Sequence, residues 1–184
     1  MLAVDTEIQL PVQGARAGEP DAWDALFKRY QLPLYAYAFE LLRDEQASLD
    51  VVQESFITAV RHIRSLQNDE KFGSWMFSIA HQRCIQHWRR SGREHPVEVE
   101  ELEAFPSDDL DPSEWCFRRE QEEQVMELLG HLPPTQRAVL LLHFLEDFSL
   151  EEIARITESP MGTVKSRLHY AKSALRRLLE DQRP

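Results

Sequence analysis

Apolar residues in the last third of the chain recur with the period of an α-helix. The stripe that they form consists of Val164, Leu168, Ala171, Leu175 and Leu178. This spacing is typical of one long amphipathic helix that buries a narrow face. A shorter helix precedes it, because Ser149 is a good N-cap and Glu152 completes a capping box. The break at Thr157-Glu158, followed by Ser159-Pro160 as N-cap and first helical residue, predicts a tight turn between the two helices.

The opposite face of the long helix is cationic and contains no acid. It presents Gly162, Lys165, Ser166, His169, Ser173, Arg176 and Arg177, with Tyr170 at its edge. Cations are favoured near the C-terminus of any helix, but Lys165 and Ser166 lie in the second turn, where the helix dipole gives a cation no help. A short helix, a turn and a helix with this face predict a helix-turn-helix that lays its second helix in the major groove of DNA.

Helical periodicity also runs through the rest of the chain, and no stretch of useful length alternates as a strand would. Six further helices are predicted. They begin at Asp21, at Pro33, at Ser48 (to about Leu66), at Phe72 (to Arg90), at Ser113 (to about Leu132) and at the pair Pro133-Pro134. The fold class is therefore all-α.

An acidic stretch divides these helices into two groups. Residues 92–123 carry 12 acidic and 3 basic side chains, whereas the blocks on either side are neutral. Residues 92–112 hold three prolines and few large apolar residues, too few to offset the chain entropy. We therefore expect two small helical bundles joined by an extended acidic linker. The expected segments are a loosely ordered lead-in at 1–17, a bundle at 18–91, the linker at 92–112 and a bundle with the helix-turn-helix at 113–184.

The net charge of −11 argues against tight DNA binding by the chain alone, because non-specific affinity depends on neutralising phosphates. Almost all of the excess of acids lies in residues 92–123, between two neutral blocks, so it does not argue against a locally cationic reading helix. A chain built this way is expected to hold DNA only with the help of another protein.

The helix at 48–66 has a polar reverse side with one apolar residue in its middle. That side presents Asp50, Gln53, Glu54, Ile57 and Arg61. An apolar anchor rimmed by charge is typical of a contact with a partner protein. Single exposed isoleucines are also common, so the pattern leaves both interpretations open.

A polar loop at 64–71 leads into a helix that is apolar nearly all round. Along that helix aromatic rings interleave with cations: Phe72, Trp75, Phe77 and Trp88 with Arg83, His87, Arg89 and Arg90. Aromatic rings beside arginines suit single-stranded bases and their phosphates. The same rings could instead belong to the core of the bundle, and the sequence leaves both open.

Several other classes of protein are not indicated. The seven histidines form no HExxH pattern, and the chain has no Gly-rich phosphate loop or GxSxG, so no catalytic residue, metal or cofactor is expected. Cys84 and Cys116 lack a CxxC partner. No apolar run reaches 18 residues and the N-terminus lacks the order of a signal peptide. We expect a cytoplasmic protein that does not insert into membranes.

Four stretches resemble motifs of the extracytoplasmic-function sigma factors, the smallest class of bacterial RNA polymerase specificity subunits. They are LDVVQESF (49–56), KFGSWMFSIA (71–80), HLPPTQRAVLLLHFLEDFSLEEIA (131–154) and SPMGTVKSRLHYAKSALRRLL (159–179). They stand in the order and spacing of that family. The resemblance implies that 18–91 and 113–184 are sigma domains 2 and 4. The implied function is promoter recognition and DNA melting for transcription initiation, without enzymatic activity.

The resemblance also implies roles for three groups of residues. Docking on the clamp helices of the largest polymerase subunit is implied for the face with Asp50, Gln53, Glu54, Ile57 and Arg61. Recognition and melting of the −10 element, with capture of a flipped non-template base by the loop at 64–72, is implied for Gln67, Asn68, Asp69, Lys71, Phe72, Trp75, Arg83, Trp88, Arg89 and Arg90. Reading of the −35 element is implied for Thr163, Lys165, Ser166, Arg167, His169, Tyr170, Ser173 and Arg176.

The partners implied by the resemblance are core RNA polymerase and promoter DNA. The polymerase contacts would be the clamp helices and the flap of the second-largest subunit, and the DNA would be both duplex and single-stranded. Many relatives are held inactive by an anti-sigma protein, which we expect here too. The acidic linker would thread through the polymerase active-site cleft toward the RNA exit path.

The chain departs from the family pattern at its tight turns. The family usually has Gly where Asp147 stands and a Leu-Gly pair where Thr157-Glu158 stands, and we expect the fold to survive because Asp tolerates such a turn. His81 replaces the usual Asn. The alternative interpretation is a helix-turn-helix regulator that acts without forming a holoenzyme. A regulator of the two-component type would need an α/β receiver with alternating strands in residues 1–91, which the pattern does not show.

Overall fold

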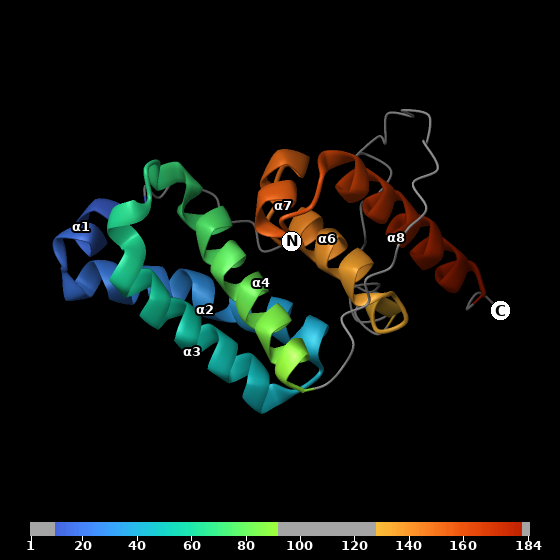
Figure 1. Cartoon of the computed structure of the whole chain (residues 1–184), viewed down its shortest axis with the longest axis horizontal. Coiled ribbons are helices and arrows are strands. Elements are labelled where there is room, and N and C mark those ends of the chain that lie inside the picture. The colour runs from blue at the N-terminus through green and yellow to red at the C-terminus, as the bar shows by residue number, and fades with distance from the viewer. Residues whose placement is uncertain (1–9, 92–127, 182–184) are drawn as a thin grey trace.

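The computed structural model describes residues 10–91 and 128–181, and every regular element in these two ranges is helical (Figure 1). The elements are α1 (Val12–Ala17), α2 (Pro20–Leu42), α3 (Glu45–His62), the 3₁₀ turns η1 (Ile63–Ser65) and η2 (Asp69–Lys71), α4 (Phe72–Arg90), α6 (Pro134–Leu145), α7 (Leu150–Ile156) and α8 (Met161–Asp181). The all-α prediction is confirmed. The expected linker at 92–112 and most of the helix expected at 113–132 lie outside the described residues.

The N-terminal bundle is built on α2, which corrects the prediction that Pro33 restarts the chain. One unbroken helix runs from Pro20 to Leu42 with Pro33 inside it. A proline inside a helix costs roughly 3 kcal/mol, because it removes one backbone donor and crowds the preceding turn. Tyr30 and Leu34 lie on either side of Pro33 and are buried. Fully burying large side chains contributes about 2 kcal/mol each, so the core outweighs the proline.

The chain before α2 is more ordered than predicted. Residues 10–17 were expected to belong to a loosely ordered lead-in, but Val12–Ala17 form α1, with Val12 and Ala15 buried. The indole nitrogen of Trp23 donates to the carbonyl of Ala15 at 3.0 Å. Gly18 ends α1 with φ of 86°, a conformation that glycine adopts at little cost. Residues 1–9 lie outside the described part of the chain.

The start of α3 lies three residues earlier than predicted. Asp44 is the N-cap, and its carboxylate accepts a hydrogen bond from the backbone N–H of Ala47 at 2.9 Å. Ser48, the expected start, is buried and donates to the carbonyl of Asp44. The helix expected at 72–90 is confirmed as α4, with both bounds as predicted.

The C-terminal bundle contains the predicted helix-turn-helix. Ser149 caps α7, and both halves of the capping box with Glu152 are present. The inner faces of α7 and α8 are buried against α6 through Ile153, Ile156, Val164, Leu168, Ala171 and Leu175. The local caps and the helical stripe are sufficient to define this unit, so the prediction from sequence holds here.

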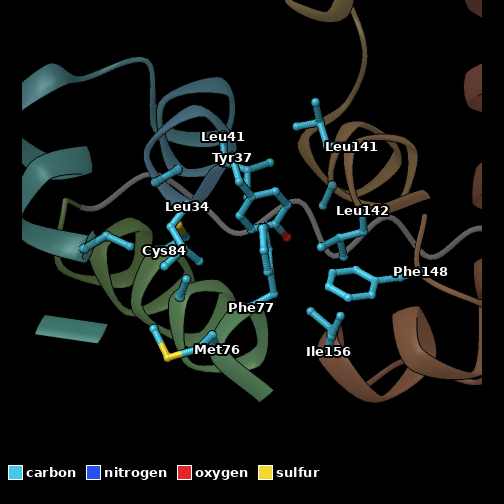
Figure 2. Packing of buried hydrophobic residues seen from close by; sticks show 14 of the residues in the cluster. Leu34, Tyr37, Leu41, Met76, Phe77, Cys84, Leu141, Leu142, Phe148 and Ile156 are labelled. Atoms are coloured by element: carbon cyan, nitrogen blue, oxygen red, sulfur yellow. The ribbon is translucent and has the colours of Figure 1, made fainter. Parts of the chain in front are cut away.

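The two bundles pack against each other, which the sequence did not predict. The ring of Phe77 on α4 lies 5.3 Å from that of Phe148, edge to face. Figure 2 shows Tyr37 and Phe77 of the N-terminal bundle opposite Leu142, Phe148 and Ile156 of the C-terminal bundle. Two bundles joined by an extended linker were expected, and the structure adds a direct contact between them.

Arg137 joins the bundles through the backbone. Its buried guanidinium, on α6, donates to the carbonyl of Glu40 near the end of α2 and to the carbonyl of Leu132 at 2.8 Å. The last carbonyls of a helix have no partner within the helix, and a cation is favourable there. A longer ion pair, of 3.4 Å, joins Arg29 on α2 to Glu146. Burial raises the pKa of Glu146, although the positive charge of Arg29 acts to lower it.

Both turns at which the chain departs from the family pattern adopt left-handed backbone. Asp147 has φ of 51° and Glu158 has φ of 50°. This conformation costs a non-glycine residue about 1–2 kcal/mol. The cost falls directly on the two positions where the family usually has glycine.

Replacing Glu158 by glycine should therefore stabilise the protein. Glycine relieves the strain of the left-handed backbone in the folded state, and this gain exceeds the stabilisation of the unfolded state by the added conformational entropy. Glu158→Gly should therefore raise the free energy of unfolding by about 0.5 kcal/mol. Glu151→Gly, on the right-handed backbone of α7, should lower it by about 1 kcal/mol. Urea denaturation of both variants measures these changes. If both substitutions lower the free energy of unfolding equally, the backbone at Glu158 is not strained.

Candidate nucleic-acid and protein interfaces

The face of α8 that was expected to read the −35 element is formed by only some of the residues expected there. Lys165 and Arg176 are exposed. Four more of the expected residues are half-buried on the same helix: Thr163, His169, Tyr170 and Ser173. The rings of His169 and Tyr170 lie edge to face at 5.9 Å. A helix that presents these side chains can contact base edges and phosphates in a major groove.

Two of the expected reading residues are directed elsewhere. Ser166 is buried, and its hydroxyl donates to the carbonyl of Thr163. The guanidinium of Arg167 donates to the hydroxyl of Ser159 at 2.9 Å, so it bridges α8 to the turn that precedes it. In this structure Ser166 and Arg167 shape the helix-turn-helix rather than presenting donors to DNA.

The loop between α3 and α4 exposes a short polar segment. Gln67 and Asn68 are exposed, while Asp69 and Lys71 are half-buried. The side chain of Asn68 accepts a hydrogen bond from the backbone N–H of Glu70 at 2.9 Å, which fixes the turn into η2. The expected site residues of this loop therefore lie together on an ordered turn.

One residue that supports this loop was missed by the sequence analysis. Arg16 on α1 donates to the carbonyl of Leu66 at 2.8 Å and pairs with Asp69 at 2.6 Å. It lies in the segment expected to be loosely ordered. No local pattern could have indicated it, since its partners are 50 and 53 residues away.

Lys71 connects the loop to the other bundle. Its ammonium group lies 2.9 Å from a carboxylate oxygen of Glu152, the residue that completes the capping box of α7. Burial raises the pKa of Glu152, but the hydrogen bonds from Lys71 and Ser149 outweigh it and leave the pKa below its ordinary value. Glu152 therefore remains ionised at neutral pH and ties the loop to the helix-turn-helix.

Two aromatic residues expected to contact DNA are core residues instead. Phe72 is fully buried against the rings of Tyr30 and Trp75, and Trp88 is buried as well. These rings are too deeply packed to stack on bases in this structure, because they lie on the buried side of α4, which packs against α2, α3 and α7 (Figure 1). Trp75 is half-buried.

The arginines of α4 divide into two kinds. Arg89 and Arg90 are exposed at the end of the helix. Arg83, also expected to contact DNA, pairs with Glu54 of α3 at 3.1 Å and donates to the hydroxyl of Thr58 at 2.9 Å. It therefore links the expected DNA face to the expected polymerase-docking face.

The outer face of α3 is polar with apolar residues set into it. Asp50, Gln53, Glu54, Ile57 and Arg61 are all exposed, as expected. Leu49, Ile57 and Val60 are 48%, 43% and 55% exposed, so three apolar side chains rather than one lie on the outside of this helix. The spacing 49, 53, 57 and 60 follows one side of a helix, a signal that was present in the sequence but not used.

Other kinds of site are not found in the described ranges. Residues 10–91 and 128–181 contain no group of three or more His, Cys, Asp or Glu side chains that could hold a metal ion. Within the same residues, no helix combines the length and the apolar character needed to cross a membrane.

Two family models match the chain, one on each bundle. The model for sigma-70 region 2 matches residues 26–94, and the model for sigma-70 region 4 matches residues 122–183. The RNA polymerase sigma-H factor of Pseudomonas aeruginosa is 32% identical over 98% of this chain and 97% of its own length. The chain belongs to the extracytoplasmic-function group of the sigma-70 family.

Other relatives extend the likeness to the whole sigma factor. The ECF sigma factor SigW of Bacillus subtilis is 26% identical over 95% of this chain and 97% of its own. Among solved structures, CnrH in complex with the cytosolic domain of CnrY has a TM-score of 0.66 and 22% identity, over 95% of this chain and 98% of that one. RpoE of Bartonella quintana, in complex with the anti-sigma factor NepR, has a TM-score of 0.62 and 25% identity, over 86% and 98%.

The sigma factor is therefore an RNA polymerase specificity subunit for transcription initiation. Most of α2 and all of α3, the loop and α4 fall in region 2, and α6, α7 and α8 fall in region 4. The alternative of a regulator with an N-terminal α/β receiver is wrong, since the described residues of that half are helical and match region 2. Arg16 precedes the matched range.

The ion pair between the bundles can be measured by a double-mutant cycle. Lys71→Met and Glu152→Gln should show a coupling free energy of about 0.5–1 kcal/mol at pH 7. Glutamine still serves a capping box, so the cycle isolates the pair. The folded-state pKa of Glu152 is lowered, so the coupling is fully present above the ordinary pKa of a glutamate and is lost as the pH falls through the lower folded-state pKa.

Urea denaturation of the four proteins between pH 7 and pH 3 provides the measurement. The matched control is Glu151→Gln, the neighbouring acid in the first turn of α7, which should show no coupling with Lys71→Met. A coupling that is equal for both acids, or that does not change with pH, would contradict a specific pair.

Proposed function

We propose that this sigma factor docks on core polymerase through α3 and holds promoter DNA through two separate contacts. The outer face of α3 binds the clamp helices of the largest subunit. The loop at 64–72 holds a non-template base flipped from the −10 element, and the exposed face of α8 reads the −35 element. In this role the chain contributes recognition and strand separation, while the catalysis belongs to the polymerase.

The outer face of α3 is the observation that carries the proposal. Its three exposed apolar residues lie beside Gln53 and Glu54 on a helix whose inner face is already buried in the core. Apolar side chains set into a polar rim are typical of protein interfaces, where the apolar residues supply most of the affinity. A solvated structural helix has no need of such a face.

The packing of the two bundles supports a particular order of events. Docking through α3 requires no rearrangement, because that face is exposed while the bundles are in contact. DNA binding at both elements requires the bundles to part, since Lys71 is tied to Glu152 across their interface. Polymerase would therefore bind first, then separate the bundles and fix their spacing. The contacts with the −10 and −35 elements are each weak alone. Once their spacing is fixed, either contact raises the effective concentration of the other, and together they bind tightly.

The structural relatives support a second partner. CnrH and RpoE were each solved with a partner protein, CnrY or the anti-sigma factor NepR. We propose that this sigma factor is likewise held inactive by an anti-sigma protein, which would compete for the exposed face of α3. Sigma factor, polymerase and inhibitor would then meet in the cytoplasm.

Substitutions on α3 should weaken polymerase association without unfolding the chain. Gln53→Ala combined with Ile57→Ser should reduce the affinity for core polymerase about tenfold or more, the loss expected for an interface anchor. The control is Leu32→Ser, a more exposed apolar residue on α2 away from its buried stripe. Fluorescence anisotropy of labelled sigma factor with core polymerase provides the measurement, and wild-type affinity of the double variant would refute the docking face.

A substitution on α8 should weaken only the upstream contact. Lys165→Ala should lower holoenzyme affinity for duplex promoter fragments and reduce the slope of log affinity against log salt by roughly 0.9, one phosphate contact. Lys28→Ala, an exposed lysine of the other bundle, is the control. The probe is duplex DNA selected by wild-type holoenzyme from a random pool. Unchanged affinity and slope would refute this part of the proposal.

A further inference from the structure

The short helix α1 packs beside the loop that carries the expected −10 contacts. It is held to the bundle by buried Val12 and Ala15 and by the hydrogen bond from Trp23 to the carbonyl of Ala15. It precedes the region 2 match, which begins at residue 26. Nothing in the recognised motifs therefore assigns α1 a role.

Arg16 holds the loop at two positions with one nitrogen. Its Nη2 atom donates to the carbonyl oxygen of Leu66 at 2.8 Å and lies 2.6 Å from Oδ1 of Asp69. These two anchors lie on either side of Gln67 and Asn68, which are exposed. The guanidinium is thus placed under the part of the loop that projects into solvent.

We infer that Arg16 is a positioning residue for base capture by this loop, an inference that rests on the proposed function of residues 64–72. A loop held in its binding geometry before the base arrives loses less conformational freedom on binding. Both of its contacts are charge-assisted, and such bonds are stronger than neutral ones. Arg16 touches neither polymerase nor DNA in this role and acts through the backbone at Leu66 and the carboxylate of Asp69.

The test uses holoenzyme reconstituted from core polymerase and the full-length sigma factor. The probe is a pool of single-stranded DNA oligonucleotides of random sequence, and the readout is the base enrichment that holoenzyme selects at each position. Arg16→Ala should reduce enrichment at the captured position about fivefold, the scale expected for one partly exposed charge-assisted contact. Affinity for core polymerase and preference for −35 duplex should remain at wild-type values.

Two further variants separate positioning from general stability. Arg16→Lys keeps the charge and should recover part of the lost enrichment. Lys28→Ala breaks an ion pair of the same 2.6 Å length in the same bundle, one whose partner Asp24 also lies on α2, and should leave enrichment unchanged. If Arg16→Ala does not fold, Arg16→Met keeps the apolar stem of the side chain, removes every donor and should reduce the same enrichment.

The outcomes distinguish this inference from the proposed function. If Gln67→Ala and Asn68→Ala leave selection at every position unchanged, the role of the loop itself is wrong. If those variants lose selection while Arg16→Ala keeps it, the loop binds the base but Arg16 does not position it. An equal loss at all positions, accompanied by weaker polymerase binding, would make Arg16 a structural residue and overturn the inference.

Discussion

The arrangement of the molecule depends on one buried guanidinium. Arg137 belongs to the C-terminal bundle, yet it donates to the carbonyl of Glu40 near the last turn of α2. The same side chain donates to the carbonyls of Gly130 and Leu132 before α6. A buried cation is costly unless its donors find acceptors, and the end of a helix provides carbonyl acceptors that have no partner within the helix. Removing Arg137 would leave carbonyls of both bundles without partners at once, so the position of each bundle depends on the other.

The contacts that close the molecule involve Lys71, one of the residues expected to act on DNA. Lys71 pairs with Glu152 across the interface, and Phe77 packs on Phe148 just before the helix-turn-helix. The closed form therefore satisfies polar and apolar groups that would be exposed if the bundles parted. Any partner that separates them must supply interactions of comparable free energy. In the proposed mechanism polymerase would do so through the outer face of α3, whereas promoter DNA alone must act against the acidic net charge of −11.

Local sequence signals predicted local structure and failed where distant residues decide. The capping box of Ser149 and Glu152 and the apolar stripe of α8 were sufficient to define the helix-turn-helix, because each depends on neighbours a few residues away. Pro33 was misjudged because the core around Tyr30 and Leu34 outweighs a local helix breaker. Arg83 was expected to contact DNA from its place among aromatic rings and from the resemblance, and its ion pair with Glu54 on another helix could not be predicted from the sequence. No sequence pattern near Arg16 indicated a role, because its partners Leu66 and Asp69 come close to α1 only in the folded protein.

The loop at 64–72 is held from both sides, and the two supports differ in kind. Arg16 belongs to the same bundle as the loop, so its contacts with Leu66 and Asp69 persist when the bundles part. Glu152 belongs to the other bundle, so its contact with Lys71 exists only in the closed form. In the proposed mechanism, separation would release the lysine for a phosphate while the exposed turn at Gln67 and Asn68 keeps its shape. A loop supported only by the other bundle would lose its geometry when the bundles part, which is the step before base capture in the proposed mechanism.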